Sequence, residues 1–155
     1  LLARMAHDVE LVLERTTARV SDTRVEVAFE PGSLRVTGAL VDGAVDPALL
    51  DASQRQEIER NVRNQVLKTS SFPRASFEGD FDATATPVTV RGTLELLGRR
   101  QPISFELARE GDAHVGELTI VPSRWGIAPY RALLGALKLR DTAAIRIEVA
   151  APRGQ

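Results

Sequence analysis

The chain has 155 residues, of which 43% are apolar, and its 20 basic and 21 acidic residues leave a formal net charge of −1. This length fits one domain with a sizeable core. The charge balance argues against nucleic acid as the main partner, because that binding needs a concentrated basic surface. The absence of cysteine excludes disulfides, a thiolate metal site and a cysteine nucleophile. No apolar run reaches the roughly 20 residues of a membrane-spanning helix.

Alternation of apolar and polar residues recurs along the chain and predicts strands with one face in a core and the other in water. It is clearest from Val88 to Leu107, where two alternating runs are joined by a basic turn. The first run of the chain is expected to continue to about Val20. The predicted strands cover residues 9–20, 25–29, 34–40, 77–81, 88–96, 103–107, 118–120 and 145–149. Gly, Asp and Pro dominate the turns between them, so the sequence predicts an all-β, antiparallel protein.

One segment, from Asp51 to Lys68, departs from this pattern and predicts an amphipathic helix. Its apolar residues recur every four positions, at Ile58, Val62 and Val66. The start of the helix is left open between Asp46-Pro47, Asp51 and Ser53, each of which offers a capping side chain. We expect this single helix to cover an opening of the sheet or barrel.

A second segment, from Trp125 to Leu139, is too long for a hairpin turn and too apolar for a solvated loop. We expect it to form a short helix or a packed flap. Contact with a membrane surface is the less favoured alternative for Leu133 to Leu139, because this run is short and contains Lys138.

Catalytic patterns are weak in this sequence. The only two histidines are His7 and His114, and His7 is followed by Asp8. This pair could act in acid–base chemistry or hold a metal ion, or it could simply anchor the N-terminal segment. Neighbouring strand residues point to opposite faces, so His7 and Asp8 would not converge on one ion. Without a Gly-x-Ser-x-Gly elbow or a glycine-rich phosphate loop, we expect no metal, no cofactor and no enzymatic activity.

Two aromatic residues, Trp125 and Tyr130, stand close together after the 118–120 strand. They could form a rim that grips an apolar ligand, with an indole N–H or a phenol as the polar contact. They could equally form a plug that closes one end of a small barrel. The sequence leaves both interpretations open.

Five segments resemble corresponding elements of YceI-like proteins. The run from Val66 to Phe77 is similar to the region where their helix ends. Val90 to Gly98 looks like the "v-x-G-x-L-t-i-x-G" strand and turn of the family, and Ser123 to Ile127 resembles their "R-x-x-F-G-I" element, with Trp125 in the aromatic place. The run from Asp141 to Val149 is similar to the closing strand of the family. The opening run, Arg4 to Asp8, resembles the start of an actinobacterial-type branch.

The resemblance implies a lipocalin-like antiparallel β-barrel of about eight strands, with one covering α-helix and a short helical flap. Characterised relatives hold a long isoprenoid in the barrel, such as a polyisoprenoid quinone or its precursor. Family members carry one more strand before the His-Asp segment, and this chain starts too late to supply it. Incomplete closure of the barrel is therefore expected.

Together, these observations predict a single domain over residues 1–155 that binds a long isoprenoid-type lipid without catalysis. The residues expected to line the tunnel or its mouth are Val27, Phe29, Val36, Phe77, Phe81, Leu94, Phe105, Trp125, Tyr130 and Ile147. The alternatives are a stress or interaction protein with a filled barrel and, more remotely, a small hydrolase that uses His7. A homodimer is considered on family grounds only, and a cytoplasmic location is preferred to export.

Overall fold

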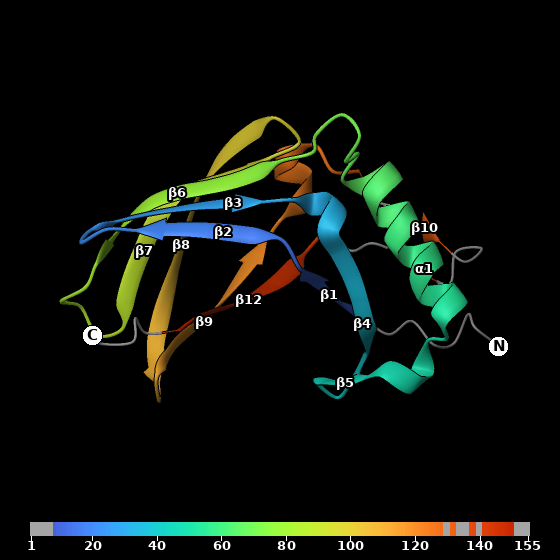
Figure 1. Ribbon diagram of the computed structural model, residues 1–155, viewed down its shortest axis with the longest axis horizontal. Helices are drawn as coiled ribbons and strands as arrows, with labels where there is room; N and C mark the ends of the chain where they lie inside the picture. Colours follow the sequence, from blue (N-terminus) through green and yellow to red (C-terminus); the bar gives the residue numbers. More distant parts are fainter. Residues whose placement is uncertain (1–7, 129–130, 133–136, 139–140, 151–155) are drawn as a thin grey trace.

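A strongly curled antiparallel sheet of seven strands forms most of the computed structural model (Figure 1). The structure describes residues 8–128, 131–132, 137–138 and 141–150. The strand order is β12-β9-β8-β7-β6-β3-β2. In chain order, the strands are β2 (Thr16–Val20), β3 (Arg24–Phe29), β6 (Ala75–Asp82), β7 (Val88–Leu96), β8 (Arg99–Glu110), β9 (Ala113–Ile120) and β12 (Ala143–Ala150). The all-β, antiparallel prediction is thus confirmed. Among the described residues, β2 and β12 form the two edges of this half-barrel.

A second, smaller sheet continues the first at a corner. It contains β1 (Asp8–Leu13), β4 (Leu34–Val41) and β5 (Ala44–Asp46), in the order β1-β4-β5. Because β2 pairs with β3 and β1 pairs with β4, one long hairpin runs through both sheets. The strand predicted over residues 9–20 is therefore two strands, separated at Glu14 and Arg15.

Ser33 holds this corner together. Its side chain is 3% exposed, and its Oγ accepts a hydrogen bond from the Arg15 N–H (2.9 Å) while donating one to the Glu30 carbonyl (2.7 Å). A short 3-10 helix, Pro31–Ser33, turns the chain at this point. Buried hydroxyls are stable only when they have such partners, so Ser33 fixes the position at which the hairpin changes sheets.

The predicted helix is present as α1 (Ala52–Asn61), followed by a π-helical turn, Val62–Val66. Asp51 is its N-cap: the Asp51 carboxylate accepts from the Gln54 N–H, and the Gln54 side chain accepts from the Asp51 N–H. This reciprocal capping box decides between the three possible starts. The helix lies against β4 of the smaller sheet, with Ile58 buried between them (Figure 1).

The segment expected to form a short helical flap has a different local structure. A 3-10 helix, Pro122–Trp125, precedes it, with proline at the start and the left-handed Gly126 (φ 77°) at its C-cap. The described residues that follow form two short antiparallel strands, β10 (Arg131–Ala132) and β11 (Leu137–Lys138). The apolar run from Leu133 to Leu139 lies largely outside the described residues.

Candidate functional site

The inner, concave face of the seven-stranded sheet gathers the apolar rows of six strands. The strand register sets Val27 opposite Phe77, and Phe77 opposite Leu94. A second line runs through Phe81, Val90 and Phe105. Because cross-strand partners share a face, the alternation along each strand becomes a continuous apolar surface across the sheet.

This surface has a buried centre and a partly accessible periphery. The centre is a cluster of fully packed residues: Phe77, Val90, Leu94, Leu107, Ile120 and Trp125. Around it lie half-buried apolar residues that contact the cluster and still reach solvent: Val25, Val27, Phe29, Phe81, Val88, Leu96, Ile103, Phe105, Leu118, Ala143, Ile145 and Ile147. A long apolar molecule placed against this periphery would remove further apolar surface from water.

Phe77 lies flat on a shelf made by two glycines. Gly79 and Gly92 face each other across β6 and β7. A Cβ atom at Gly79 would lie 2.8 Å from the tip of the Phe77 ring and 2.6 Å from the Arg91 carbonyl oxygen. The ring of Phe105 meets Phe77 at a centroid distance of 5.8 Å and a tilt of 49°. The two glycines therefore let an aromatic ring lie along the sheet, and so set the depth of the concave face.

Trp125 closes the end of this face nearest α1. Its side chain is completely buried, and its indole Nε1 donates a hydrogen bond to the Leu94 carbonyl at 2.9 Å. Because the indole N–H is already bonded within the protein, the geometry favours the plug over the ligand-gripping rim. Tyr130, the other half of that pair, lies outside the described residues.

Val36 does not belong to the concave face. It lies on β4 in the smaller sheet, 6% exposed, and borders a surface groove beside α1. The sequence placed it with Val27 and Phe29 because all three alternate in the same way. The corner at Ser33 puts β4 into a different sheet, so this predicted lining residue is corrected. The other predicted residues of the inner row, Phe29, Phe81, Leu94, Phe105 and Ile147 among them, lie where the alternation placed them.

The groove beside α1 has a different chemical character. It is lined by Arg35, Val36, Ala52, Arg55, Gln56 and Glu59. Three of these six side chains carry a charge, which makes the groove a poor match for a long apolar chain. The concave face is the better candidate for apolar binding.

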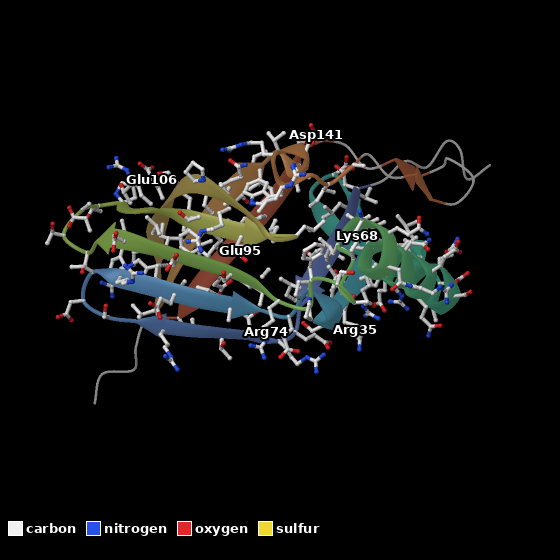
Figure 2. All side chains as sticks on the ribbon, turned by 90° about the horizontal axis from the view of Figure 1, so that it is seen from above. Arg35, Lys68, Arg74, Glu95, Glu106 and Asp141 are labelled. Atoms are coloured by element: carbon white, nitrogen blue, oxygen red, sulfur yellow. The ribbon has the colours of Figure 1, made fainter. Side chains whose placement is uncertain are left out.

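The outer face of the sheet carries a network of charges. Glu78 pairs with Arg100 and with Arg24 (3.1 Å), and Arg100 also pairs with Glu95 at 3.3 Å (Figure 2 labels Glu95). Hydrogen bonding to Arg100 is the main cause that lowers the pKa of Glu78. All these groups are exposed, so the network orders the strands with little effect on stability.

A Ser–Asp pair links the short helix to the start of the last strand. Asp141 accepts hydrogen bonds from the Ser123 N–H (2.9 Å) and from its Oγ. The hydrogen bond from the Ser123 hydroxyl lowers the pKa of Asp141. Among the described residues no histidine adjoins them, since His114 lies on β9, and the pair links the short helix to the segment before β12. His7 lies outside those residues.

Metal-binding chemistry is not apparent in the described part of the chain, where no three His, Cys, Asp or Glu side chains come together. Within that same part, no helix is long and apolar enough to cross a membrane.

Sequence reasoning missed the role of Gly79 and Gly92. Both occupy inward positions, in phase with Phe77 and Phe81 on β6 and with Val90 and Leu94 on β7. A glycine within an alternating strand is a signal of close approach by another group. That signal was present in the sequence, but the partner, the Phe77 ring, is identified only by the fold.

Comparison with known proteins identifies the family. The family model described as "YceI-like domain" matches residues 4–151. The chain belongs to the YceI-like domain family. The resemblance to the YceI-like family is therefore confirmed at the level of the family. No curated protein matches this YceI-like chain.

Solved structures agree with this fold. A Campylobacter jejuni YceI protein is similar with a TM-score of 0.67 at 14% identity, over 96% of this chain and 86% of that one. Burkholderia cenocepacia BcnA gives 0.59 at 13% identity, over 97% and 98%. A polyisoprenoid-binding domain from Saccharophagus degradans, implicated in plant cell wall breakdown, gives 0.57 at 13% identity, over 92% and 85%. At these identities the likeness concerns the fold, and it confirms the lipocalin-like architecture of this YceI-like chain.

Proposed function

We propose that this protein is a non-enzymatic carrier that holds a long apolar lipid of isoprenoid type against the concave face of its seven-stranded sheet. The observation that carries the proposal is the ring of half-buried apolar side chains around the packed centre. Burying apolar surface gives about 2.5 kcal/mol for each 100 Å² removed from water. A similar fold in a polyisoprenoid-binding domain supports the ligand class.

The filled centre favours a slim ligand over a bulky one. Phe77 and Leu94 occupy the middle of the face, so the accessible apolar surface lies along the strands beside them. A small barrel of about eight strands leaves room for one narrow ligand at most. A single isoprenoid chain is narrow, flexible and entirely apolar, which fits that space.

Lipid extraction followed by mass spectrometry tests the proposal, on protein purified from its native host. We expect a long-chain isoprenoid lipid to be recovered with the wild-type protein. Ile147→Asn places an amide on the concave face and should abolish recovery, whereas Ala144→Asn, on the exposed face of the same strand, should retain it. Recovery of no long-chain lipid from the wild type, or equal recovery from both variants, would contradict the proposal.

A second candidate is an interaction protein whose interior is filled and carries no ligand. The packed cluster around the fully buried Trp125 favours it, since a solid centre needs no further molecule for stability. Absence of lipid from the native protein, together with absence of binding after delipidation, would select this function.

A further inference from the structure

The end of the curled sheet farthest from Trp125 is bordered by a rim of inward-facing residues. Each strand ends or begins there, at the turns that join β2 to β3, β6 to β7 and β8 to β9 (Figure 1). On five strands the last inward-facing residue at this end is apolar: Val20, Val25, Phe81, Val88 and Val149. Val20 and Val149 are 61% and 43% exposed, so this rim is open to solvent.

On the other two strands the rim residue is polar. Alternation along β8 places Arg109 on the same face as Phe105 and Leu107. His114 is the register partner of Arg109 on β9, and it also pairs with the rim residue Val149 on β12. Two hydrogen-bonding side chains therefore stand next to each other in a rim that is otherwise apolar.

At the opposite end, the polar side chains of β8 that share the face of Leu94 are already engaged: Gln101 is hydrogen-bonded to Arg124, and the Arg99 guanidinium lies beside Gly126. Trp125 is completely buried there, and its N–H is bonded to the Leu94 carbonyl. Asp141 and its partner Ser123 lie at that end, while Glu106 lies toward the open rim (Figure 2). A lipid tail that enters from the open rim would thus run toward the indole.

We infer that Arg109 and His114 form a polar notch that binds the uncharged, oxygen-bearing head of the lipid, with the tail directed toward Trp125. This inference rests on the proposed function and specifies its ligand. The Arg109 Nε donates to the Gly111 carbonyl at 3.2 Å, which holds the guanidinium beside the turn. Arginine has five N–H donors in all, so further donors are available for a hydroxyl or carbonyl oxygen.

The charges of this turn disfavour an anionic head. Glu110, which alternation places on the outer face of β8, and Asp112 in the turn follow Arg109 in sequence, so residues 109–112 carry one positive and two negative charges. A diphosphate would meet their repulsion, whereas an alcohol or carbonyl oxygen accepts a hydrogen bond without adding charge. The notch therefore selects a neutral acceptor over an anion.

Three ligands with the same twenty-carbon isoprenoid tail test the inference: geranylgeraniol, its diphosphate and the corresponding hydrocarbon. After delipidation, we expect the wild type to bind the alcohol about tenfold more tightly than the hydrocarbon, as one added hydrogen bond to a charged group predicts. The diphosphate should bind more weakly than the alcohol. The variant with Arg109→Met and His114→Leu should lose this tenfold preference and bind the hydrocarbon unchanged.

Arg91→Met is the matched control, because Arg91 is an exposed arginine on the outer face of β7. It should leave all three affinities unchanged. Tighter binding of the diphosphate, or an unchanged preference in the double variant, would overturn the notch while leaving lipid binding intact. Failure of the wild type to bind any of the three ligands would instead contradict the proposed function.

Discussion

The position of the Phe77 ring depends on two glycines next to it, because neither has a side chain that would occupy the space of the ring. Gly79 and Gly92 each leave space in which the Phe77 ring lies, and each stands close to a backbone carbonyl of the neighbouring strand. A side chain at either position would therefore meet both a ring and a carbonyl. Rings can move, but a carbonyl within a sheet cannot move without breaking the strand pairing.

Gly79→Ala is accordingly expected to destabilise the protein by about 1–3 kcal/mol, the usual cost of overpacking a core. Its Cβ would lie 2.6 Å from the Arg91 carbonyl oxygen. Gly32→Ala is the control, since nothing lies within 4 Å of a Cβ there, and it should change stability by less than about 0.5 kcal/mol. Urea unfolding measures both variants, and equal stabilities would show that the glycine shelf has no structural role.

The hydrogen-bonded link between Ser123 and Asp141 should make the stability of the protein depend on pH in the acid range. Its folded-state pKa is lowered, mainly by the Ser123 hydroxyl, so the stability from this link is present above the ordinary carboxyl pKa. That contribution is lost as the pH falls through the lowered value. Ser123→Ala should raise the pKa of Asp141 and make stability less dependent on pH in the acid range.

Carboxyl-carbon NMR titration of Asp141 measures this pKa directly. Ser104→Ala is the matched control, because Ser104 is exposed on β8 and does not contact Asp141. It should leave the titration unchanged. An Asp141 pKa that stays the same in Ser123→Ala would refute the assigned cause.

At the level of elements, α1 covers a part of the β4 edge to which none of the described strands is paired. β1 pairs with one edge of β4 from Leu34 onward, while β5 reaches the other edge only at Ala39. In the gap, the Val36 N–H donates to the Glu59 carboxylate at 3.0 Å, and the Arg63 guanidinium donates to the Leu34 carbonyl. Two side chains of the helical segment thus supply the acceptor and donor that a neighbouring strand would have provided.

Glu59→Leu should therefore destabilise the protein by about 1–3 kcal/mol, because it leaves the Val36 N–H without its acceptor and removes the carboxylate that pairs with Arg63. Glu59→Gln keeps an oxygen for Val36 and should cost less. Glu57→Leu, on the same helix, is the control and should change stability by less than about 0.5 kcal/mol. Faster hydrogen exchange at the Val36 amide should accompany the loss, and unchanged exchange in Glu59→Leu would contradict the edge-covering role.

The same elements show how far local patterns reach. The strands and the helix follow from periodicities within a few residues, so their positions could be predicted. The assignment of Val36 to the smaller sheet could not be predicted in this way, because the corner between the sheets depends on a hydrogen bond between Arg15 and Ser33, which are 18 residues apart. The role of Trp125 was undecided for a similar reason, since its partner carbonyl at Leu94 is 31 residues away. Pairings between distant residues decide which of two alternating rows faces the common interior.

At the scale of the whole molecule, the curl of the large sheet brings strands from its two edges to the same concave surface. β3 lies next to one edge and β12 is the other edge, yet Val27 and Ile147 both pack against the same buried cluster. A ligand on the concave face would contact both sides of the half-barrel at once. A ligand in the groove beside α1 would contact only β4 and the helix.

Binding of geranylgeraniol to the delipidated protein should therefore stabilise both sides of the large sheet together. At a free concentration 100 times its Kd, a ligand that binds only the folded state adds about 2.7 kcal/mol to the free energy of unfolding. Hydrogen exchange should slow on β3 and β12 alike and stay unchanged on β4 and β5, because the described residues that form and surround the inner-face cluster belong to the large sheet, apart from Trp125. If hydrogen exchange slows only beside α1, the ligand binds in the groove lined by Arg35 and Arg55 and not on the concave face. A polar ligand would then fit the site better than the lipid.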